Sequence, residues 1–445
     1  MARVHVRWAV GATTVLVVAL IAACGSSARL PVSAGFGPNP ELPPPSTSLI
    51  PTAKIAPAIG WPSGKTPVAA AGIRVNAFAS GLEHPRFVYA LPNGDVLVTE
   101  ANAPPRPDDA KGIRGWFFHR FQRQAGGAAP SANRITLLRD ADGDGVAEIR
   151  SVMIAGLNAP FGIALVGQNL YVANTDAVLR FTYRDGATAI SGKADTLVAL
   201  PAGTLNHHWT KTIVASRDGT KLYVSIGSNS NAAENGMANE VDRATIWEID
   251  LRTNAHRTFA TGLRNAAGLA IEPTTGALWA AVNERDELGG DLVPDYMTAV
   301  RDGAFYGWPY SYFGTHVDTR VKPQRPELVA TAVVPDYALG SHTASVGLTA
   351  AAGTTLPAAF SNGMFVGQHG SWNRKPLTGY KVIFVPFNAG VPSGPPVDVL
   401  TGFLTENNKA MGRPVGVAID KRGSLLVADD VGNTIWRVSK GAPQP

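Results

Sequence analysis

Residues 262–309 combine residue types that suit an anionic ligand held beside a hard cation. Arg264 and Asn265 stand together near the start of this stretch, and carboxylates gather between Glu284 and Asp295. The guanidinium of Arg264 is a permanent cation whose forked donors suit a carboxylate or a developing oxyanion. Several carboxylates in one loop supply the oxygen ligands that Ca²⁺ requires. A solvated acidic loop, and an ion pair of Arg264 with a neighbouring loop, explain the same residues in purely structural terms.

The pair His207-His208 supplies a candidate general base. An imidazole titrates near neutral pH, so His208 needs no large pKa shift to accept a hydroxyl proton. For any single histidine, a role in capping a loop or filling a wall is the simpler explanation. The assignment of His208 as a general base is therefore favoured only if other reactive groups face it.

Two further arginines are expected near Arg264. Arg413 occupies the matching position in the last sequence repeat, and Arg374 ends the motif at residues 370–374. Three guanidinium groups facing one opening would be costly without an anion to balance them. Together they predict an anion pocket more strongly than each does alone.

Residues 140–145 form a second acidic motif, Asp-Ala-Asp-Gly-Asp-Gly, which copies the start of an EF-hand loop. The twelfth position is Ser151 where an EF-hand has glutamate, and no helical pattern flanks the loop. We expect a plain turn between strands, with weak cation binding left open.

A repeated unit must position these residues. Each copy has a loop, a short apolar strand, a turn often of Asp/Asn-Gly type, and a second apolar strand. Five clear copies and a degenerate one predict an all-β fold over residues 71–440, a six-bladed β-propeller of four-stranded antiparallel sheets. In a propeller, the loops that enter the innermost strands meet at one end of the channel. The copies begin near Gly81, Gly156, Asn206, Gly262 and Gly412, and the degenerate copy spans residues 361–387.

Composition agrees with this fold and excludes one class of partner. The 445 residues include 47 Gly and 33 Pro, and 16% are charged, which indicates many turns and few exposed helices. The net charge of +5 is not gathered into Lys/Arg runs, so nucleic acid is not expected as a partner.

The N-terminus predicts export. A short basic start and an apolar run precede Cys24, the only cysteine, in a junction that resembles a bacterial lipoprotein cleavage box. We expect a signal peptide at residues 1–23, lipidation of Cys24 and a Pro/Ser-rich spacer at residues 24–70. The protein would then be an extracytoplasmic lipoprotein anchored to a membrane. Ordinary secretion or an uncleaved anchor are the alternatives.

From about residue 77 to 438, the chain resembles the soluble quinoprotein glucose/sorbosone dehydrogenase family, with the sorbosone branch the nearest likeness. Members of that family are six-bladed propellers that bind pyrroloquinoline quinone (PQQ) and calcium. The resemblance rests on His208 with residues 218–227, Arg264-Asn265, Glu284, Asp295, the Tyr-Gly-Trp-Pro run at 306–309 and residues 367–374.

The resemblance implies a role for each matching residue. His208 would take the proton from the hydroxyl at the sugar's anomeric carbon, while Arg264 and Asn265 would hold the cofactor's oxygens. Arginines and Ca²⁺ would bind and polarise the cofactor, which supplies the redox chemistry. Further cofactor-holding positions align with Thr343, Arg374 and Arg413.

The implied calcium ligands are the carboxylates of Glu284 and Asp295, with main-chain oxygens near Arg285 and Tyr306. Some positions depart from the glucose-oxidising members. Leu157 stands where they carry a glutamine, Val415 where they carry an arginine, and Arg374 or a neighbour where they carry a lysine. These departures argue against glucose as the substrate.

The resemblance therefore predicts a PQQ-dependent dehydrogenase of an aldose or a sorbosone-like aldehyde, which passes electrons to an external quinone or cytochrome. A non-catalytic propeller lipoprotein that binds sugar or a protein partner is the second hypothesis. A lactonase-type propeller hydrolase is the third, and the arginines speak against it.

Overall fold

The computed structural model describes residues 27–46, 52, 54–105, 107, 125–126 and 130–441. Cys24 and the expected signal peptide lie outside these residues. Among the described residues, no helix has the length and apolar character needed to span a membrane. Helical structure in the same residues is limited to single turns: η1 (Val32–Gly35), η2 (Met237–Glu240), α3 (Pro326–Val329) and η3 (Ala358–Phe360).

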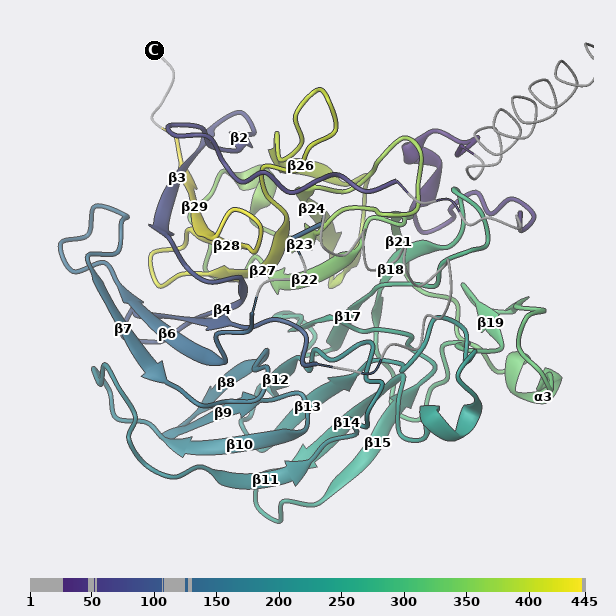
Figure 1. Ribbon diagram of the computed structural model, residues 1–445, viewed down its shortest axis with the longest axis horizontal. Coiled ribbons are helices and arrows are strands. Elements are labelled where there is room, and N and C mark those ends of the chain that lie inside the picture. The colour runs from purple at the N-terminus through teal and green to yellow at the C-terminus, as the bar shows by residue number, and fades with distance from the viewer. Residues whose placement is uncertain are drawn as a thin grey trace, which may run out of the picture.

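Six antiparallel sheets of four main strands each form a six-bladed β-propeller, as the repeats predict (Figure 1). Each of the five clear repeats supplies the first two strands of a blade, because its two apolar runs pair across the intervening turn. The degenerate repeat at 361–387 instead supplies the second and third strands of its blade. The blades follow in chain order, each from its innermost strand outwards. The first blade has β4 (Pro85–Ala90), β5 (Val96–Glu100), β6 (Arg134–Arg139) and β7 (Ile149–Ile154), and the second has β8 (Ile163–Val166), β9 (Asn169–Ala173), β10 (Ala177–Thr182) and β11 (Asp195–Ala199). The third has β12 (Ile213–Ala215), β13 (Lys221–Ile226), β14 (Thr245–Asp250) and β15 (His256–Thr261), and the fourth has β16 (Gly268–Ile271), β17 (Leu278–Val282), β18 (Pro294–Ala299) and β21 (Tyr337–Ser341). The fifth has β22 (Ser345–Ala350), β23 (Gly363–Gln368), β24 (Lys381–Asn388) and β26 (Val397–Thr401), and the sixth has β27 (Pro414–Ile419), β28 (Leu425–Asp429), β29 (Thr434–Lys440) and β3 (Ile73–Ser80). Two small pairings, β19 (Ser311–Tyr312) with β20 (His316–Val317) and β24 with β25 (Val391–Pro392), complete the strands.

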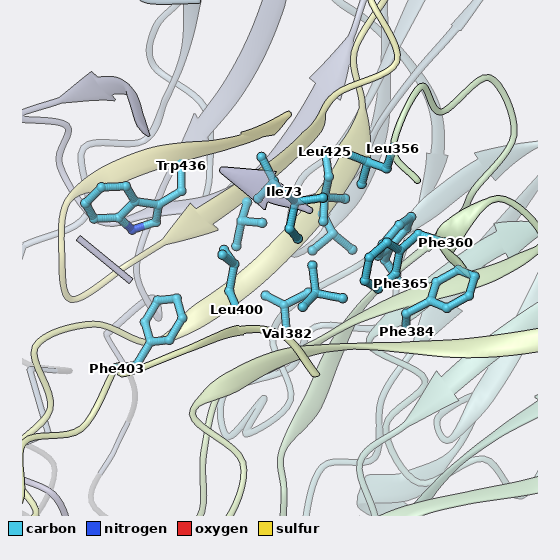
Figure 2. Close-up of a cluster of buried hydrophobic side chains, with 14 of the residues drawn as sticks. Ile73, Leu356, Phe360, Phe365, Val382, Phe384, Leu400, Phe403, Leu425 and Trp436 are labelled. Carbon is cyan, nitrogen blue, oxygen red and sulfur yellow. The ribbon is translucent and has the colours of Figure 1, made fainter. Parts of the chain in front are cut away.

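The ring is closed by β3, which precedes the first blade in sequence but pairs antiparallel with β29 of the last blade. Apolar side chains fill the spaces between neighbouring blades. At the join of the fifth and sixth blades, Ile73 of β3 packs in one cluster with Phe365, Leu425 and Trp436 (Figure 2). The first and last parts of the propeller are thus held by both hydrogen bonds and apolar packing.

The innermost strands approach one another closely enough to exclude side chains at some positions. A Cβ added to Gly347 of β22 would lie 2.0 Å from the carbonyl oxygen of Val415 in β27. Glycine is therefore required where these strands meet, since real Cβ atoms do not reach such distances.

The described N-terminal segment pairs with the propeller at two places. Its strand β1 (Phe36–Gly37) pairs with β21, and β2 (Val68–Ala69) pairs with β26. Outer strands of a propeller expose unpaired backbone groups, and an adjacent extended segment can satisfy them. We call the described residues between 27 and 70 the strap; they form the purple and dark blue trace along the upper side of the molecule in Figure 1.

Candidate functional site

The predicted site residues meet at one end of the propeller. In an antiparallel blade, the start of the first strand and the end of the second lie at the same end. His208, Asn265 and Arg413 precede first strands, whereas Glu284 and Arg374 follow second strands. We call this end the mouth of the propeller.

His208 is held by a hydrogen bond that defines its tautomer. Its Nδ1 lies 2.8 Å from the carbonyl oxygen of Ser228 and 3.0 Å from the Ser228 hydroxyl. A carbonyl oxygen can only accept, so Nδ1 carries the proton and Nε2 is left as a base. Burial, and next the charge of Arg264, hold the pKa of His208 well below its usual range. The imidazole is therefore neutral at neutral pH.

Asn265 reaches the same place as His208 from the next blade. A Cβ added to Gly227 would lie 2.6 Å from both the His208 Cβ and the Asn265 Oδ1. The missing side chain at Gly227 thus lets the two residues approach. Among the described residues, the Asn265 amide has no hydrogen-bond partner that would prevent it from binding a ligand.

Arg264 is buried and its guanidinium is already bonded. Its Nη2 lies 3.3 Å from Asp286 Oδ2 and 3.0 Å from Asn231 Oδ1, and its Nη1 donates to the Glu284 carbonyl at 2.7 Å. The ion pair that the sequence left open as a structural explanation is present. Asp286 also accepts a hydrogen bond from Asn373 Nδ2 at 2.6 Å.

Asn231 and Asp286 both bond Arg264, a role that the sequence did not predict for either residue. Asn231 reads as an ordinary turn residue, yet its carbonyl oxygen also accepts from Trp308 Nε1 at 3.0 Å. Burial raises the pKa of Asp286, but the His342 hydrogen bond and Arg264 outweigh it, so the carboxyl is ionised. For Asn231 the only signal in the sequence was the polar run at 227–231 directly after an apolar strand, whereas Asp286 belongs to the acidic stretch between Glu284 and Asp295.

The four residues expected to bind calcium are all buried, but they differ in whether a side-chain oxygen is left without a hydrogen-bond partner. Glu284 Oε2 bonds Arg285 Nε at 3.0 Å, whereas Glu284 Oε1 is buried with no partner. The Arg285 guanidinium is fully buried and also contacts Asp318 at 3.1 Å. Tyr306 donates its hydroxyl to the Ala299 carbonyl at 2.9 Å. Glu284 alone of these side chains thus keeps a free oxygen for a cation.

The Asp295 carboxylate connects two segments of the chain through hydrogen bonds. Its Oδ1 accepts from Glu284 N at 3.0 Å, and its Oδ2 accepts from Ser345 N at 2.7 Å and Thr343 Oγ1 at 3.1 Å. Burial raises its pKa to about 6. Thr343 is itself fully buried. Asp295 and Thr343 therefore join the fourth and fifth blades.

Arg374 and Arg413 lie under the strap. Arg374 Nη2 donates to the Leu30 carbonyl at 3.1 Å and lies 3.3 Å from Asp291, while Arg413 Nη2 donates to the Ala56 carbonyl at 3.2 Å. The Nε atoms of both arginines are buried without partners. Unlike Arg264 and Arg374, Arg413 has no carboxylate partner among the described residues.

A further ionic cluster at the mouth escaped the sequence analysis. Asp430 is buried, forms an ion pair with Arg86 and lies 2.9 Å from His369 Nε2. The Arg86 guanidinium lies over the rings of Phe161 and Trp209, at 5.9 and 5.8 Å from their centroids. In the first repeat, Pro85-Arg86 occupies the position that His207-His208 has in the third. This match was the signal in the sequence that Arg86 lies at the mouth.

The acidic motif at 140–145 lies away from the mouth, between β6 and β7. Ligand atoms of Asp140, Asp142, Asp144 and Glu148 lie within 4.8 Å of one another, the only such acidic group that the described residues contain. Asp140 accepts from Gly143 N at 2.6 Å and from Arg422 Nη1 at 3.0 Å. Protein donors thus already bind part of this cluster.

Comparisons with known proteins agree with the fold. A family model described as TrAA12-like matches residues 130–298 and 327–441, more than half of the chain. An uncharacterized protein of Borreliella burgdorferi is 27% identical over 293 residues, which are 63% of this chain and 76% of that protein. A pyrroloquinoline quinone-dependent pyranose dehydrogenase of Coprinopsis cinerea is 24% identical over 432 residues, 83% of this chain and 54% of that protein.

A pyrroloquinoline quinone-dependent sugar dehydrogenase of Hypocrea jecorina is 23% identical over 270 residues, 55% of this chain and 57% of that protein. The chain therefore spans little more than half the length of these two dehydrogenases. Among solved structures, the holo form of the C. cinerea pyranose dehydrogenase PQQ domain is similar with a TM-score of 0.66 and 21% identity, over 87% of this chain and 100% of that one. A calcium structure of the Trichoderma reesei carbohydrate-active enzyme of family AA12 has a TM-score of 0.67 and 19% identity, over 87% and 98%. At these identities the structural likeness establishes the propeller fold.

Proposed function

Since the chain belongs to the TrAA12-like family, we propose that it is a PQQ-dependent oxidoreductase that oxidises an aldose or a sorbosone-like aldehyde. Relatives at 23–24% identity that bear this activity in their names support the proposal. The observation that carries it is the state of His208: Nδ1 is committed to Ser228, so Nε2 is a neutral base at the mouth.

The residues present fit the proposed cofactor. PQQ is an anion with three carboxylates, and the buried, unpartnered Nε atoms of Arg374 and Arg413 are donors that such a ligand would satisfy. Arg413 also lacks a carboxylate partner among the described residues, so an anion would balance its charge. PQQ would supply the carbonyl carbon that accepts a hydride from the substrate.

Within this proposal, His208 Nε2 takes the proton from the hydroxyl on the carbon that is oxidised. Loss of this proton to His208, together with the hydride that PQQ would accept, would convert an aldose into a lactone. The Asn265 amide and the positive charge of Arg264 hold the oxygens of the cofactor and stabilise negative charge that develops there. The ion pair with Asp286 keeps Arg264 in place.

Calcium is proposed at Glu284, whose Oε1 is a buried carboxylate oxygen without a partner. Asp295 and main-chain oxygens near Arg285 and Tyr306 remain the other proposed ligands. We also propose an external quinone or cytochrome as the electron acceptor. Lipidation of Cys24 and an extracytoplasmic, membrane-anchored location are proposals that rest on the N-terminal sequence alone.

The test uses the full chain with PQQ and Ca²⁺ and follows dye reduction over a panel of aldoses, sorbosone and simple aldehydes. His208→Ala should lower kcat by about 100- to 10,000-fold while PQQ binding, measured by its absorbance, is kept. His256→Ala is the control, because His256 stacks on Trp247 in the outer part of the same blade. If no substrate is oxidised and the PQQ spectrum does not change, the proposal fails and a non-catalytic binder replaces it. Loss of PQQ binding in His208→Ala would make His208 structural.

A further inference from the structure

A cavity of about 260 Å³ lies at the mouth beside the loop that carries His208. Its walls come from three successive blades: Pro104 and Pro105 follow β5, residues 158 and 175–176 flank β8 and β9, and residues 202–206 precede β12. The cavity is several times the volume that one water occupies in the liquid, about 30 Å³. It lies just below the usual range of small-molecule pockets, which begins near 300 Å³. One small ligand, or one ring of a larger ligand, would fill it.

The floor of this cavity is rigid and shared with the proposed base. Asn206 lies two residues before His208, and its Nδ2 donates to Thr175 Oγ1 at 2.7 Å. Thr175 Oγ1 in turn donates to the carbonyl of Trp209 at 2.9 Å, and Arg243 Nη2 donates to Asn206 Oδ1 at 2.9 Å. Both floor side chains are buried, and each takes part in two of these hydrogen bonds. They fix the cavity relative to His208 rather than bind a ligand themselves.

The rim of the cavity carries the groups that are free to bind. Asp176 Oδ2 accepts from Asn158 Nδ2 at 2.8 Å, and its Oδ1 has no partner among the described residues. Thr204 presents an exposed hydroxyl, and Pro104 and Pro105 add apolar ring faces. Asp176 is the only ionisable residue in the lining, while Arg243 lies behind the floor.

These features select a neutral, hydroxyl-rich ligand. An anion would face the Asp176 carboxylate with no cation in the lining to offset the repulsion. Hydroxyl groups, by contrast, donate to a carboxylate in strong charge-assisted hydrogen bonds. The proline rings would pack against the C–H face of a sugar ring. We propose that the cavity binds the second sugar ring of an oligosaccharide whose reducing end lies at His208.

This inference rests on the proposed function and names its substrate class. The test compares kcat/KM for maltose and cellobiose with that for glucose, using the full chain loaded with PQQ and Ca²⁺. Asp176→Ala removes the rim carboxylate and Thr204→Trp fills the cavity. Each variant should lower kcat/KM for the disaccharides about tenfold, as expected for one lost hydrogen bond to a charged group, and leave the value for glucose within about twofold. Asp195→Ala is the control, because Asp195 lies on the outer strand β11 of the same blade and pairs with Arg180.

Calorimetry of the same sugars with the protein lacking PQQ provides a second readout that does not need turnover. Tighter binding of a disaccharide than of glucose, lost in Asp176→Ala and kept in Asp195→Ala, supports the subsite. Binding of this kind without oxidation of any sugar would overturn the proposed dehydrogenase and keep the subsite. Equal behaviour of glucose and disaccharides in the unmodified protein, or equal losses for both in the variants, would overturn the subsite. Circular dichroism of each variant excludes misfolding as the cause of a loss.

Discussion

At the residue scale, the mouth of the propeller is defined by which polar atoms are already bonded. His208 Nδ1, the Arg264 guanidinium and the Asp295 carboxylate are committed to protein partners. The Asn265 amide and Glu284 Oε1 are not bonded to any described residue. Side chains bonded to protein partners keep the site in its shape, whereas side chains with unbonded atoms can bind a ligand. Mutations in the two groups should therefore have different effects.

The pH dependence of the reaction follows from the lowered pKa of His208. A base acts when unprotonated, and burial together with Arg264 keeps His208 unprotonated below pH 6.5. We expect kcat/KM to stay flat as the pH falls through 6.5 and to decline only at lower pH. In Arg264→Met this decline should move towards higher pH, because a charge that lowers the pKa is lost.

Steady-state rates between pH 4 and 8 check this expectation. Arg257→Met is the control, since Arg257 forms an outer ion pair with Asp302 at 2.6 Å. A decline that begins at or above pH 6.5 in the unmodified protein would contradict the neutral, buried base.

Glu284 and Asp295 should respond differently to loss of charge. Glu284→Gln removes a carboxylate with a free oxygen, so it should reduce the rise in Tm on adding Ca²⁺; it should also lower Tm in EDTA, because it weakens the buried ion pair with Arg285. Asp295→Asn turns an amide donor towards groups that are themselves donors, so it should destabilise the fold by about 1–3 kcal/mol whether or not Ca²⁺ is present. Thermal unfolding with Ca²⁺ and with EDTA separates the two cases. An unchanged response to Ca²⁺ in Glu284→Gln would remove Glu284 from the proposed calcium ligands.

At the element scale, the strap is fastened to the last blade by one tryptophan. Trp61 Nε1 donates to Asp429 Oδ2 at 2.7 Å, and burial raises the pKa of Asp429 to about 6. The indole fits because the neighbouring residues lack side chains: a Cβ at Gly412 or Gly432 would lie 2.7 or 2.6 Å from Trp61 Nε1. The same strap places the Ala56 carbonyl on Arg413. The strap therefore contacts Arg413, one of the residues of the proposed cofactor site.

Trp61→Phe should loosen the strap while keeping an aromatic ring against Phe403 and Trp436. The loss of one hydrogen bond to a buried carboxylate costs about 1.5–3 kcal/mol. We expect faster proteolysis within residues 54–62 and a weaker affinity for PQQ. Trp247→Phe, in β14 of the third blade, should change neither. Unaltered proteolysis and PQQ affinity in Trp61→Phe would show that the strap is held by its strand pairings alone.

At the scale of the whole molecule, stability depends on the closure of the ring by β3. Phe78 of β3 is buried with Val88, Val98 and Leu426 between the sixth and first blades. If this strand detaches, the sixth blade loses its outer strand, and the apolar contacts of Phe78 with the first blade are lost with it. The strap strand β1, by contrast, adds to an outer edge and closes nothing.

Phe78→Ala should lower the free energy of unfolding by about 3–5 kcal/mol, the usual cost of removing a buried phenylalanine. Phe36→Ala in β1 is the matched control and should cost less than half as much, because Phe36 is only half-buried. Urea unfolding measures both. Equal losses would mean that β3 is no more important to the ring than an added edge strand.

The amino-acid sequence by itself determined the number of blades, one strand pair in each of them and the end at which His208, Arg264 and Asn265 lie. This information is local: each strand pair is encoded by apolar runs about ten residues apart and by the turn between them. The tertiary structure alone decided which polar atoms remain free. Asp430 reaches Arg86 only when the last blade meets the first, and Trp61 reaches Asp429 only when the strap lies on the last blade. Residues separated by up to several hundred positions carry no shared local pattern, so their pairing depends on the packing of blades and strap.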